Sequence, residues 1–258
     1  MIGEPMRIHM RPDPVPFKLY TARQIAYGMR DEVEAEIKSM LQRGIIEPVG
    51  DEYSEWTHPL VVVRKPNGKP RVVVDFVKLN AYVQRPVHPF RTPENAVRGV
   101  KPKDSSFFST LDATSGYWQV ELAKEDRPLT TFITPWGLYR YTRSPMGLSS
   151  TGDEYCRRGD LAINGLPRVE KVVDDLLVHS DNFEQHLADV KAVLDRCRQH
   201  GITLSPSKFV FAKPEVAFVG FLVNRQGVDV DPRKIEAIKN FPRPENVMQV
   251  RSFLGPVN

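Results

Sequence analysis

Apolar residues recur every three to four positions in two long segments of the chain, and this period predicts two amphipathic helices. The first helix is expected within residues 23–43, before Gly44, and its buried face is predicted to hold Val33, Ile37, Met40 and Leu41. The second is expected over 183–200, capped by Ser180 or Asp181, with an inward face of Leu187, Val190, Leu194 and Cys197.

Short apolar runs between these helices predict strands. The runs at 59–64 and 71–76 flank K-P-N-G-K-P, which indicates a hairpin with a basic tip. Residues 130–134 and 138–142 bracket P-W-G and predict a second hairpin. The remaining strands are expected at 107–111, within 170–180, at 209–211 and at 217–223.

Helices and strands are mixed along the chain without strict alternation, which favours the α+β class. Residues 1–22 are rich in proline and are expected to be extended, whereas Asp231-Pro232 predicts the start of a short helix that reaches Phe241. A last helical segment, V-M-Q-V-R-S-F-L, is expected at 247–254.

Composition narrows the class of protein. The chain has 258 residues, of which 41% are hydrophobic and 26% charged, which is typical of a globular protein with a real core. A net charge of +4 fits a polyanionic partner and equally an ordinary basic protein. Two cysteines form no zinc-type spacing, no apolar run approaches membrane-spanning length, and the N-terminus lacks a signal-peptide core; an intracellular, cytoplasmic or nuclear location is therefore expected.

Candidate chemistry concentrates where three carboxylates end apolar strands. Asp112 follows the strand at 107–111, and Asp174-Asp175 interrupts V-E-K-V-V-D-D-L-L-V-H-S. A buried carboxylate is costly unless it faces water, is paired or binds a cation. One interpretation is a hairpin with a polar tip; the other is a Mg²⁺ site, because oxygen ligands are what Mg²⁺ requires. Sequence spacing alone leaves both open.

Six segments in order resemble the reverse transcriptases of LTR retrotransposons, especially the gypsy-like group, and the resemblance runs from about Glu47 to Gly255. They are S-E-W-T-H-P-L-V-V-V-R-K-P-N-G-K-P-R-V-V-V-D-F-V-K-L-N, F-S-T-L-D-A-T-S-G-Y-W-Q-V, S-P-M-G-L, V-V-D-D-L-L-V-H-S, S-K-F-V-F and F-V-G-F-L-V. The tail P-x-P-x-x-V-x-x-V-R-S-F-L-G resembles the family's sequence leading out of the palm and thumb.

The resemblance implies a right-hand polymerase fold and RNA-directed DNA synthesis from a primer 3′ end by two-metal nucleotidyl transfer. It places the fingers at 1–90 and 120–150, the palm at 91–119 and 151–224, and an incomplete thumb at 225–258. The implied partners are an RNA or DNA template with its primer and a dNTP, with two Mg²⁺ ions (or Mn²⁺) and no membrane. The alternative is a weak or inactive retrotransposon remnant that only binds nucleic acid.

The resemblance also implies roles for individual residues. The catalytic metal ligands would be Asp112, Asp174 and Asp175. Nucleotide-binding residues would be Lys65, Arg71, Ala113, Thr114, Tyr117 and Met146, with Lys69 and Arg64 as weaker candidates, and the primer grip would be Val219, Gly220 and Phe221. For Tyr117 an ordinary core position stays open, and Lys208 is interpreted as a surface lysine that lies near the pyrophosphate only in the alternative.

Three positions depart from the family's pattern. Val172 stands where an aromatic residue is usual, Val77 replaces an arginine, and S-S-T-G-D-E-Y-C at 149–156 replaces N-A-P-A-x-F-Q. The last segment is still expected to be a helix, although Gly152 is a poor helix former. None of these departures removes a predicted metal ligand. No protease, ribonuclease H or integrase segment is recognised, so a polyprotein fragment or a decayed genomic copy is expected.

Overall fold

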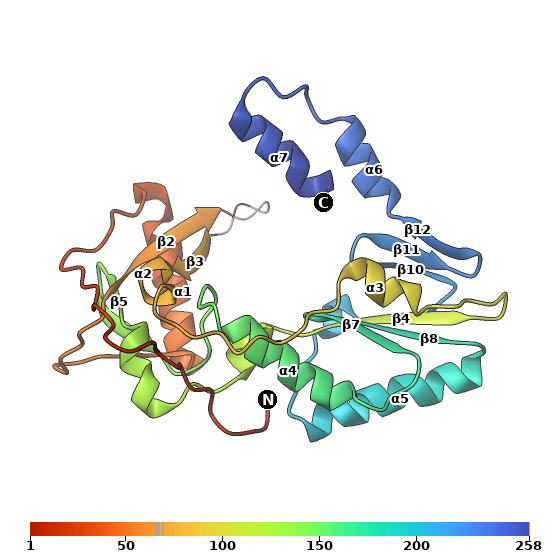
Figure 1. Cartoon of the computed structure of the whole chain (residues 1–258), viewed down its shortest axis with the longest axis horizontal. Helices are drawn as coiled ribbons and strands as arrows, with labels where there is room; N and C mark the ends of the chain where they lie inside the picture. The colour runs from red at the N-terminus through yellow and green to blue at the C-terminus, as the bar shows by residue number, and fades with distance from the viewer. Residues whose placement is uncertain (65–67, 69, 258) are drawn as a thin grey trace. The chain divides into compact units, whose positions relative to one another are not determined.

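The computed structural model describes residues 1–64, 68 and 70–257, which form two compact units (Figure 1). Unit 1 comprises Met1–Pro89, Ser115–Leu161 and His200–Thr203, and unit 2 comprises Phe90–Thr114, Ala162–Gln199 and Leu204–Asn258. Lys65 and Lys69, predicted at the basic hairpin tip, lie outside the described residues. The division into fingers, palm and thumb stays a prediction; residues 151–161, expected in the palm, belong to unit 1.

Unit 1 is built on a five-stranded sheet in the order β1-β6-β5-β2-β3. The two predicted hairpins supply four of its strands: β2 (His58–Arg64) pairs with β3 (Pro70–Val74), and β5 (Phe132–Thr134) pairs with β6 (Gly137–Tyr141). A short parallel pairing of β2 with β5 joins the hairpins, and β1 (Ile46–Pro48), which the sequence pattern missed, adds the outer edge.

Helix α1 (Arg30–Gln42) buries Val33, Ile37 and Met40, as its apolar spacing predicts, while Leu41 is only partly buried. A 3₁₀ turn, η1 (Tyr27–Met29), precedes it in place of the expected first helical turns. Unit 1 also holds the short α2 (Val77–Asn80), the 3₁₀ segments η2 (Gly116–Gln119) and η3 (Lys124–Thr130), and most of α4 (Thr151–Ile163). The altered segment at 149–156 therefore does form a helix despite Gly152.

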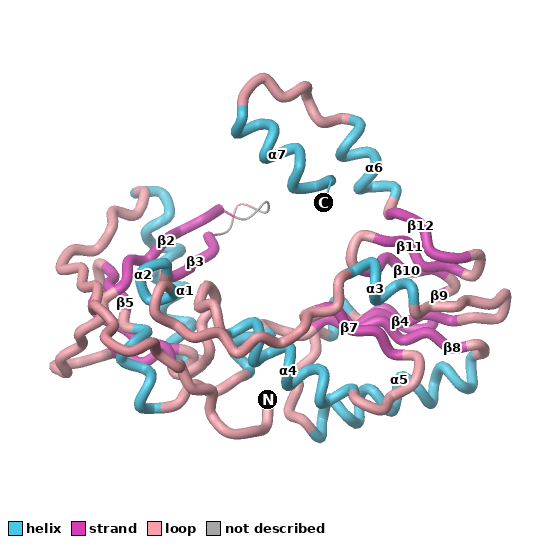
Figure 2. The backbone as a smooth tube through the Cα atoms, viewed as in Figure 1, coloured by secondary structure: helices cyan, strands magenta, loops and turns pink. Residues whose placement is uncertain are grey.

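Unit 2 contains a four-stranded sheet in the order β7-β8-β4-β9 and a three-stranded sheet in the order β10-β11-β12 (Figure 2). The strands of the first are β7 (Val169–Val172), β8 (Asp175–Ser180), β4 (Phe107–Asp112) and β9 (Val210–Lys213). Those of the second are β10 (Glu215–Phe218), β11 (Phe221–Asn224) and β12 (Gly227–Val230). Its helical segments are α3 (Pro93–Arg98), α5 (Phe183–Gln199), η4 (Pro206–Lys208), α6 (Pro232–Lys239) and α7 (Val247–Val257).

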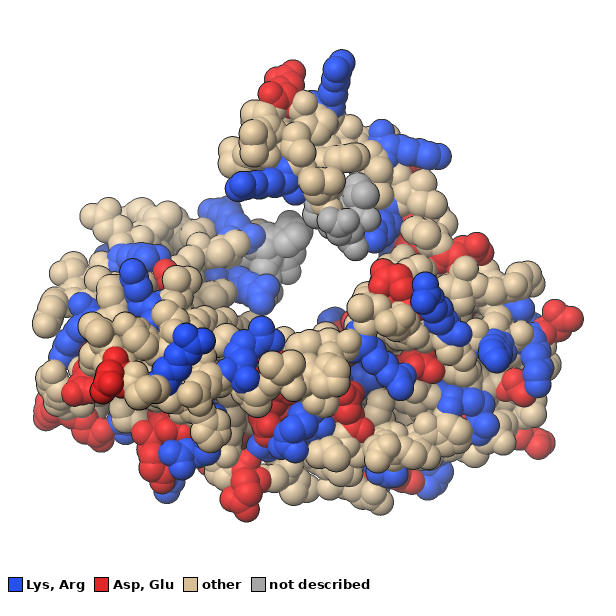
Figure 3. All heavy atoms as spheres, viewed as in Figure 1, with Lys and Arg blue, Asp and Glu red and all other residues tan. Residues whose placement is uncertain are grey.

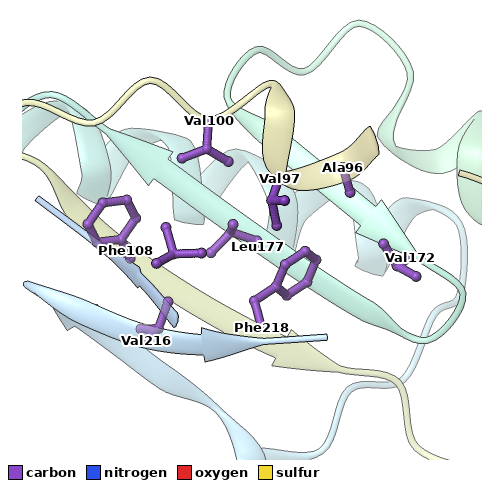
Figure 4. Packing of buried hydrophobic residues seen from close by; sticks show 9 residues of the cluster. Ala96, Val97, Val100, Phe108, Val172, Leu177, Val216 and Phe218 are labelled. Carbon is purple, nitrogen blue, oxygen red and sulfur yellow. The ribbon is translucent and has the colours of Figure 1, made fainter. Parts of the chain in front are cut away.

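One face of the four-stranded sheet is covered by α3 and β10, which enclose a hydrophobic core (Figure 4). Phe108 of β4 and Leu177 of β8 are fully buried there against Val97 of α3 and Phe218 of β10. Helix α5 lies on the opposite face, because the neighbours Phe108 and Ser109 point to opposite sides and Ser109 contacts His186 of α5. The sheet is thus covered on both faces, which fixes the direction of every side chain along β4 and β8.

The structure corrects three predictions in unit 2. The inward face of α5 is formed by His186, Asp189, Val190, Val193 and Cys197, whereas Leu187 and Leu194 are 53% and 40% exposed. Val190 and Cys197 are buried as predicted, whereas Leu187 and Leu194 are wrong, because the buried face also carries a histidine and an aspartate that the apolar period does not select. The helix is capped by Asn182, whose side chain accepts a hydrogen bond from the Gln185 amide, and not by Ser180 or Asp181.

The run 217–223 is also not one strand. It is a hairpin of β10 and β11 that turns at Val219-Gly220, where both residues have positive φ. The cap of α6 is as predicted: the Asp231 side chain accepts from the Arg233 amide and Pro232 opens the helix. None of the helices in the described part of the chain has the length and apolar character needed to cross a membrane.

A buried histidine in unit 1 makes stability depend on pH. His58 is fully buried between the rings of Trp56 and Phe76, and its Nε2–H donates to the Leu129 carbonyl at 3.0 Å. Burial lowers the pKa of His58 to about 4. Since the unfolded chain titrates near 6.5, folding stability is present above that pH and is lost as pH falls from about 6.5 toward 4.

We therefore expect His58→Gln to lose part of this pH dependence. Relative to pH 7.5, wild type at pH 4.5 should lose about 2.5 kcal/mol of unfolding free energy through His58 alone, and the variant should not. Urea unfolding at the two pH values measures the difference. His9→Gln, at an exposed histidine, is the control and should keep the wild-type dependence. Equal pH dependence in His58→Gln and wild type would contradict the assignment.

Candidate active site

Antiparallel pairing of β4 with β8 brings Asp112 and Asp175 together. The two residues are direct register partners at the end of the ladder, after Leu111 and Leu176. Partners of this kind point to the same face of a sheet with Cβ atoms about 4.5–5.5 Å apart. The expected convergence of carboxylates at one edge of the sheet is therefore present for these two aspartates.

Asp174 lies in the turn between β7 and β8, next to this pair. Val172 and Asp175 close the hairpin, and Val173-Asp174 forms its two-residue loop. The Asp174 carbonyl accepts a hydrogen bond from the Ala113 amide at 3.0 Å, which ties the turn to the residue after Asp112. All three aspartates thus belong to one small region of unit 2. The Ala113 amide, predicted to lie near the triphosphate, is used inside the protein; the roles of Ala113 and Thr114 in nucleotide binding stay predictions.

The backbone of this turn is strained. Val173 has φ of +51°, a region that β-branched residues rarely adopt. Its side chain packs against the hydrophobic core of unit 2, which holds the conformation. Strain of this kind costs on the order of 1–3 kcal/mol and is found most often at functional sites. Ser115 and Val219, which adjoin the predicted Thr114 and Gly220, also have positive φ.

Lys208 provides the positive charge at this edge of the sheet. Its Nζ lies 2.9 Å from Asp112 Oδ2, and η4, which carries it, is fixed by a hydrogen bond from the Ser205 amide to the Asp112 carbonyl. The hydrogen bond with Asp112 raises the pKa of Lys208. Lys208 is exposed, in agreement with the sequence interpretation of a surface lysine, and it forms in addition an ion pair with Asp112 that this interpretation did not include. The sequence signal for this ion pair is that Lys208 lies just before β9, and β9 pairs with β4, the strand that ends at Asp112.

The electrostatics of the site suit a cation. Burial raises the pKa of the Asp175 carboxyl, and the negative charges of Asp112 and Asp174 raise it further, while Lys208 lowers it. The donor set consists of hard carboxylate oxygens, which Mg²⁺ prefers. Within residues 1–64, 68 and 70–257, no three His, Cys, Asp or Glu side chains are preassembled into a metal-binding group. The aspartates fit a divalent cation by chemistry and by charge, in competition with Lys208.

A buried polar network supports the strands from the other face of the sheet. Ser109 of β4 and Ser180 of β8 contact the two ring nitrogens of His186, at 2.6 Å from Nε2 and 3.1 Å from Nδ1. Ser180 donates to Asp189 at 2.7 Å, and Ser109 accepts from the Ala212 amide at 2.9 Å. Ser180 therefore accepts from Nδ1–H and Ser109 donates to Nε2. Burial lowers the pKa of His186, consistent with a neutral ring.

The predicted primer grip lies in unit 2 at the tip of the β10–β11 hairpin. Val219 and Gly220 have φ of +43° and +87°, as in the turns that suit a two-residue hairpin. Phe221 pairs with Phe218 across the turn, and the Gly220 carbonyl accepts from the Asp231 amide. The turn is thus a well-defined feature; its contact with a primer stays a prediction.

Arg71 and Met146, both predicted to bind nucleotide, are neighbours in unit 1. Arg71 Nη2 lies 3.3 Å from Met146 Sδ, although 75 residues separate them in sequence. Gly147 follows with φ of +88°, and a Cβ there would lie 3.3 Å from the Val74 carbonyl oxygen. Glycine is required at this position because both its conformation and the close approach to β3 exclude a side chain.

Tyr117 is partly buried in η2 of unit 1. Its ring makes an edge-on contact with Tyr155 of α4 at 5.3 Å between centroids. Tyr155 is only 2% exposed, so one side of the Tyr117 ring is fixed by the core. The alternative of a packed core tyrosine and the predicted contact with the incoming sugar are compatible with this placement.

The departures from the family pattern are accommodated in different ways. Val172 is buried in the core of unit 2, while Val77 is 70% exposed. Asp153 of the altered segment is 1% exposed, and Arg85 pairs with both of its carboxylate oxygens at 2.8 and 3.1 Å. The His88 amide donates to Asp153 as well. An unpaired carboxylate at this depth would be costly in free energy, and the hydrogen bonds from Arg85 and the His88 amide offset that cost for Asp153.

Charge on the surface is mixed. Figure 3 shows Lys and Arg side chains interspersed with Asp and Glu over the drawn face, as the net charge of +4 implies. Many of them form ion pairs, including Arg140 with Glu47 at 2.6 Å and Lys103 with Asp181 at 2.6 Å. Net charge alone therefore gives little information about a nucleic-acid surface.

Comparison with protein-family models matches residues 63–223 to the family described as reverse transcriptase (RNA-dependent DNA polymerase). The chain is 34% identical over 240 residues to a retrovirus-related Pol polyprotein from transposon gypsy of Drosophila melanogaster, covering 88% of this chain and 22% of the relative. It is 32% identical over 250 residues to that from transposon opus, covering 94% and 24%. An enzymatic polyprotein of Cauliflower mosaic virus is 34% identical over 235 residues, covering 88% and 34%. The chain thus spans about a third of these relatives or less.

Solved structures give the same fold. The chain matches a foamy viral protease-reverse transcriptase in complex with dsDNA with a TM-score of 0.87 and 21% identity, over 100% of this chain and 52% of the other. A foamy viral protease-reverse transcriptase in complex with an RNA/DNA hybrid matches with a TM-score of 0.86 and 21% identity, over 98% and 33%. The predicted α+β class and polymerase fold are confirmed.

The buried network beneath the aspartates leads to a prediction about stability. Ser109→Ala should leave both the Ala212 amide and the His186 ring without their partner, which costs about 1–3 kcal/mol of unfolding free energy. Denaturant unfolding at pH 7.5 measures this loss. Ser105→Ala, at an exposed serine in the turn before β4 whose hydroxyl donates to the Asp181 carbonyl, should cost only about 0.5 kcal/mol, because water can replace that hydrogen bond. Equal effects of the two substitutions would contradict the role given to the network.

Proposed function

The chain belongs to the reverse transcriptase family, and we propose that it acts as an RNA-directed DNA polymerase that adds dNTPs to a primer 3′ end. The observation that carries the proposal is the register of β4 and β8, which sets Asp112 opposite Asp175 with Asp174 in the adjoining turn. The family match and the relation to gypsy-type Pol polyproteins support it.

Asp112 and Asp174 are proposed as the principal ligands of two Mg²⁺ ions (or Mn²⁺), with Asp175 beside them. When bound, the ions would activate the attacking primer hydroxyl and stabilise the charge on the leaving pyrophosphate. The raised pKa of Asp175, caused by burial and by its two acidic neighbours, supports this assignment, because the site holds more negative charge than Lys208 offsets. Lys208 must release Asp112 Oδ2 for that oxygen to act as a ligand.

Nucleotide binding is proposed for the residues that the sequence indicates. Arg71 would hold the triphosphate by charge, which suits phosphoryl transfer because catalysis there is mostly positioning and electrostatic stabilisation. Met146 would lie against the nucleotide, and Tyr117 would contact the sugar and exclude a 2′-hydroxyl. Ala113 and Thr114, which follow Asp112, would approach the triphosphate, and Lys65 would add a second cation.

The proposed partner is a primed RNA or DNA template. The titles of similar structures name dsDNA and an RNA/DNA hybrid as the nucleic acids bound by foamy viral enzymes, which supports a duplex partner for this chain. Val219, Gly220 and Phe221 would hold the primer end. We propose that fingers, palm and thumb follow the boundaries expected from the sequence and that the protein works inside the cell, where template and dNTPs are found.

The second candidate function is binding of nucleic acid without extension. Val77 favours it, since a 70% exposed valine replaces the family's arginine and offers no charge to a phosphate. The paired Asp153 argues against simple decay, because this buried acid of the altered segment is bound by Arg85 and by the His88 amide. Polymerase function is therefore proposed first.

Activity should depend on Mg²⁺ and on Asp174. With primed RNA and dNTPs, Asp174→Asn should extend primers about 100-fold more slowly than wild type, since this equals about 2.7 kcal/mol and a lost metal ligand costs several kcal/mol. Removal of Mg²⁺ by a chelator should abolish extension. Asp104→Asn, at an exposed acid of the same unit, is the control and should keep full activity. Wild type that extends no faster than Asp174→Asn would reject the polymerase in favour of the binding module.

Sugar selection should depend on the ring of Tyr117. Tyr117→Ala should raise the use of rNTP relative to dNTP by about tenfold, because removal of the ring opens the space for a 2′-hydroxyl. Competition of the two nucleotides in primer extension measures the ratio. Tyr20→Ala removes an 83% exposed ring elsewhere in unit 1 and should leave the ratio unchanged. The same ratio in Tyr117→Ala and wild type would return Tyr117 to a core role.

A further inference from the structure

Asn80 is the last residue of α2, and both ends of its amide bind one loop of unit 1. Its Nδ2 donates to the Gly147 carbonyl at 2.8 Å, and its Oδ1 accepts from the Ser149 amide at 2.9 Å. Both contacts span more than 65 residues of sequence, so they arise from tertiary structure alone. Asn80 ends the first of the family segments in the sequence, but no role and no contact were predicted for it.

The loop held in this way carries Met146. Its flanking residues Pro145 and Leu148 are buried, whereas Met146 is partly buried and Gly147 is exposed. The two ends of the loop, Pro145 and Leu148, are therefore fixed by burial, and Met146 and Gly147 form a short, more exposed tip. The Asn80 amide binds the backbone directly beneath that tip, on both sides of Leu148.

Two further contacts place the same tip against β3. Gly147 lies so close to the Val74 carbonyl that a Cβ would be 3.3 Å from its oxygen, and Arg71 of β3 reaches Met146 Sδ at 3.3 Å. The contact between Arg71 and Met146 is therefore kept only if the loop keeps its conformation against β3. Of these contacts, only those of Asn80 are direct hydrogen bonds to the loop backbone.

We call the two hydrogen bonds of the Asn80 side chain, to the Gly147 carbonyl and from the Ser149 amide, the Asn80 clamp. The clamp requires an amide side chain of this length. An aspartate has the same shape and accepts from the Ser149 amide, but it places a carboxylate oxygen against the Gly147 carbonyl and has no proton to donate. Alanine makes neither bond. Asn80→Asp and Asn80→Ala therefore separate the two halves of the clamp.

We propose that Asn80 is a positioning residue of the polymerase, which fixes the loop of Met146 and Gly147 relative to Arg71 and so sets the affinity for the incoming nucleotide. This inference rests on the proposed function for the nucleotide-binding role of Arg71 and Met146. The physical reason is that misplacing a binding group by about 1 Å can cost on the order of 100-fold in rate, although the chemistry itself is untouched.

The first measurement is hydrogen exchange of the loop amides in the free chain, which needs no activity. Asn80→Ala should speed exchange of the Ser149 amide about fivefold, since one hydrogen bond worth about 1 kcal/mol is lost. Asn80→Asp should keep this amide protected. Arg85→Gln, which loosens the neighbouring anchor of α4 at Asp153 and leaves the clamp in place, is the matched control and should also keep it protected.

The second measurement is steady-state primer extension with primer–template affinity determined separately. Both Asn80 variants should raise KM for dNTP about tenfold, with a smaller change in kcat and no change in primer–template Kd. Asn80→Asp is decisive, because the Ser149 amide is protected while the bond to Gly147 is lost. Arg85→Gln should leave KM for dNTP within about twofold of wild type.

The outcomes separate the inference from the proposed function. If wild type extends primers and both Asn80 variants keep its KM, or if KM, primer–template Kd and unfolding free energy change together, Asn80 is merely structural and the inference is wrong. Unchanged exchange of the Ser149 amide in Asn80→Ala would reject the clamp itself. Wild type that neither extends primers nor binds dNTP would reject the proposed function and the nucleotide role together, while the exchange result still judges the clamp.

Discussion

The register of the β4–β8 pair is the constraint on which the candidate site depends. Because side chains alternate along a strand, one register places Asp112 and Asp175 on one face and Ser109 and Ser180 on the other. A slip by one residue would turn the aspartates toward α5 and the serines into the apolar core. The hydrophobic residues Phe108 and Leu177 oppose such a slip, since both are fully buried.

The register is held from the face of the sheet that α5 covers, opposite to the face of the aspartates. Ser109 and Ser180 satisfy the two ring nitrogens of His186, and Ser180 also donates to Asp189, so β4, β8 and α5 are joined by directional bonds and not by apolar contact alone. A fully satisfied buried network specifies one arrangement, because any other leaves polar groups unpaired. The strained turn at Val173, which carries Asp174, is held by the packing of Val173 against the core of unit 2.

Departure from a family pattern has different meanings at different positions. At Asp153 the carboxylate is buried and is bound by Arg85 and the His88 amide, so its charge is paired within unit 1. At Val172 the side chain belongs to the core of unit 2. At Val77 nothing in the structure explains the replacement. The sequence gives no basis for ranking the three departures. They are distinguished only by how deeply each side chain is buried and by the groups it contacts.

Much of the fold was readable in the chain itself. The hairpins of unit 1, the strand ending at Asp112, the hairpin around Asp174-Asp175 and the face of α1 follow from local apolar period and turn residues, which are properties of neighbouring residues. The motifs likewise indicated the family and the three aspartates. On α5, Val190 and Cys197 are buried as predicted, but Leu187 and Leu194 are not, because His186 and Asp189 occupy buried positions through their hydrogen bonds, a condition that hydrophobicity does not encode. The ion pair of Lys208 with Asp112, the Arg85–Asp153 pair and the Asn80 clamp each join residues more than 60 positions apart. Only the tertiary structure decided them, since a polar side chain finds its partner through folding and carries no periodic signal in the sequence.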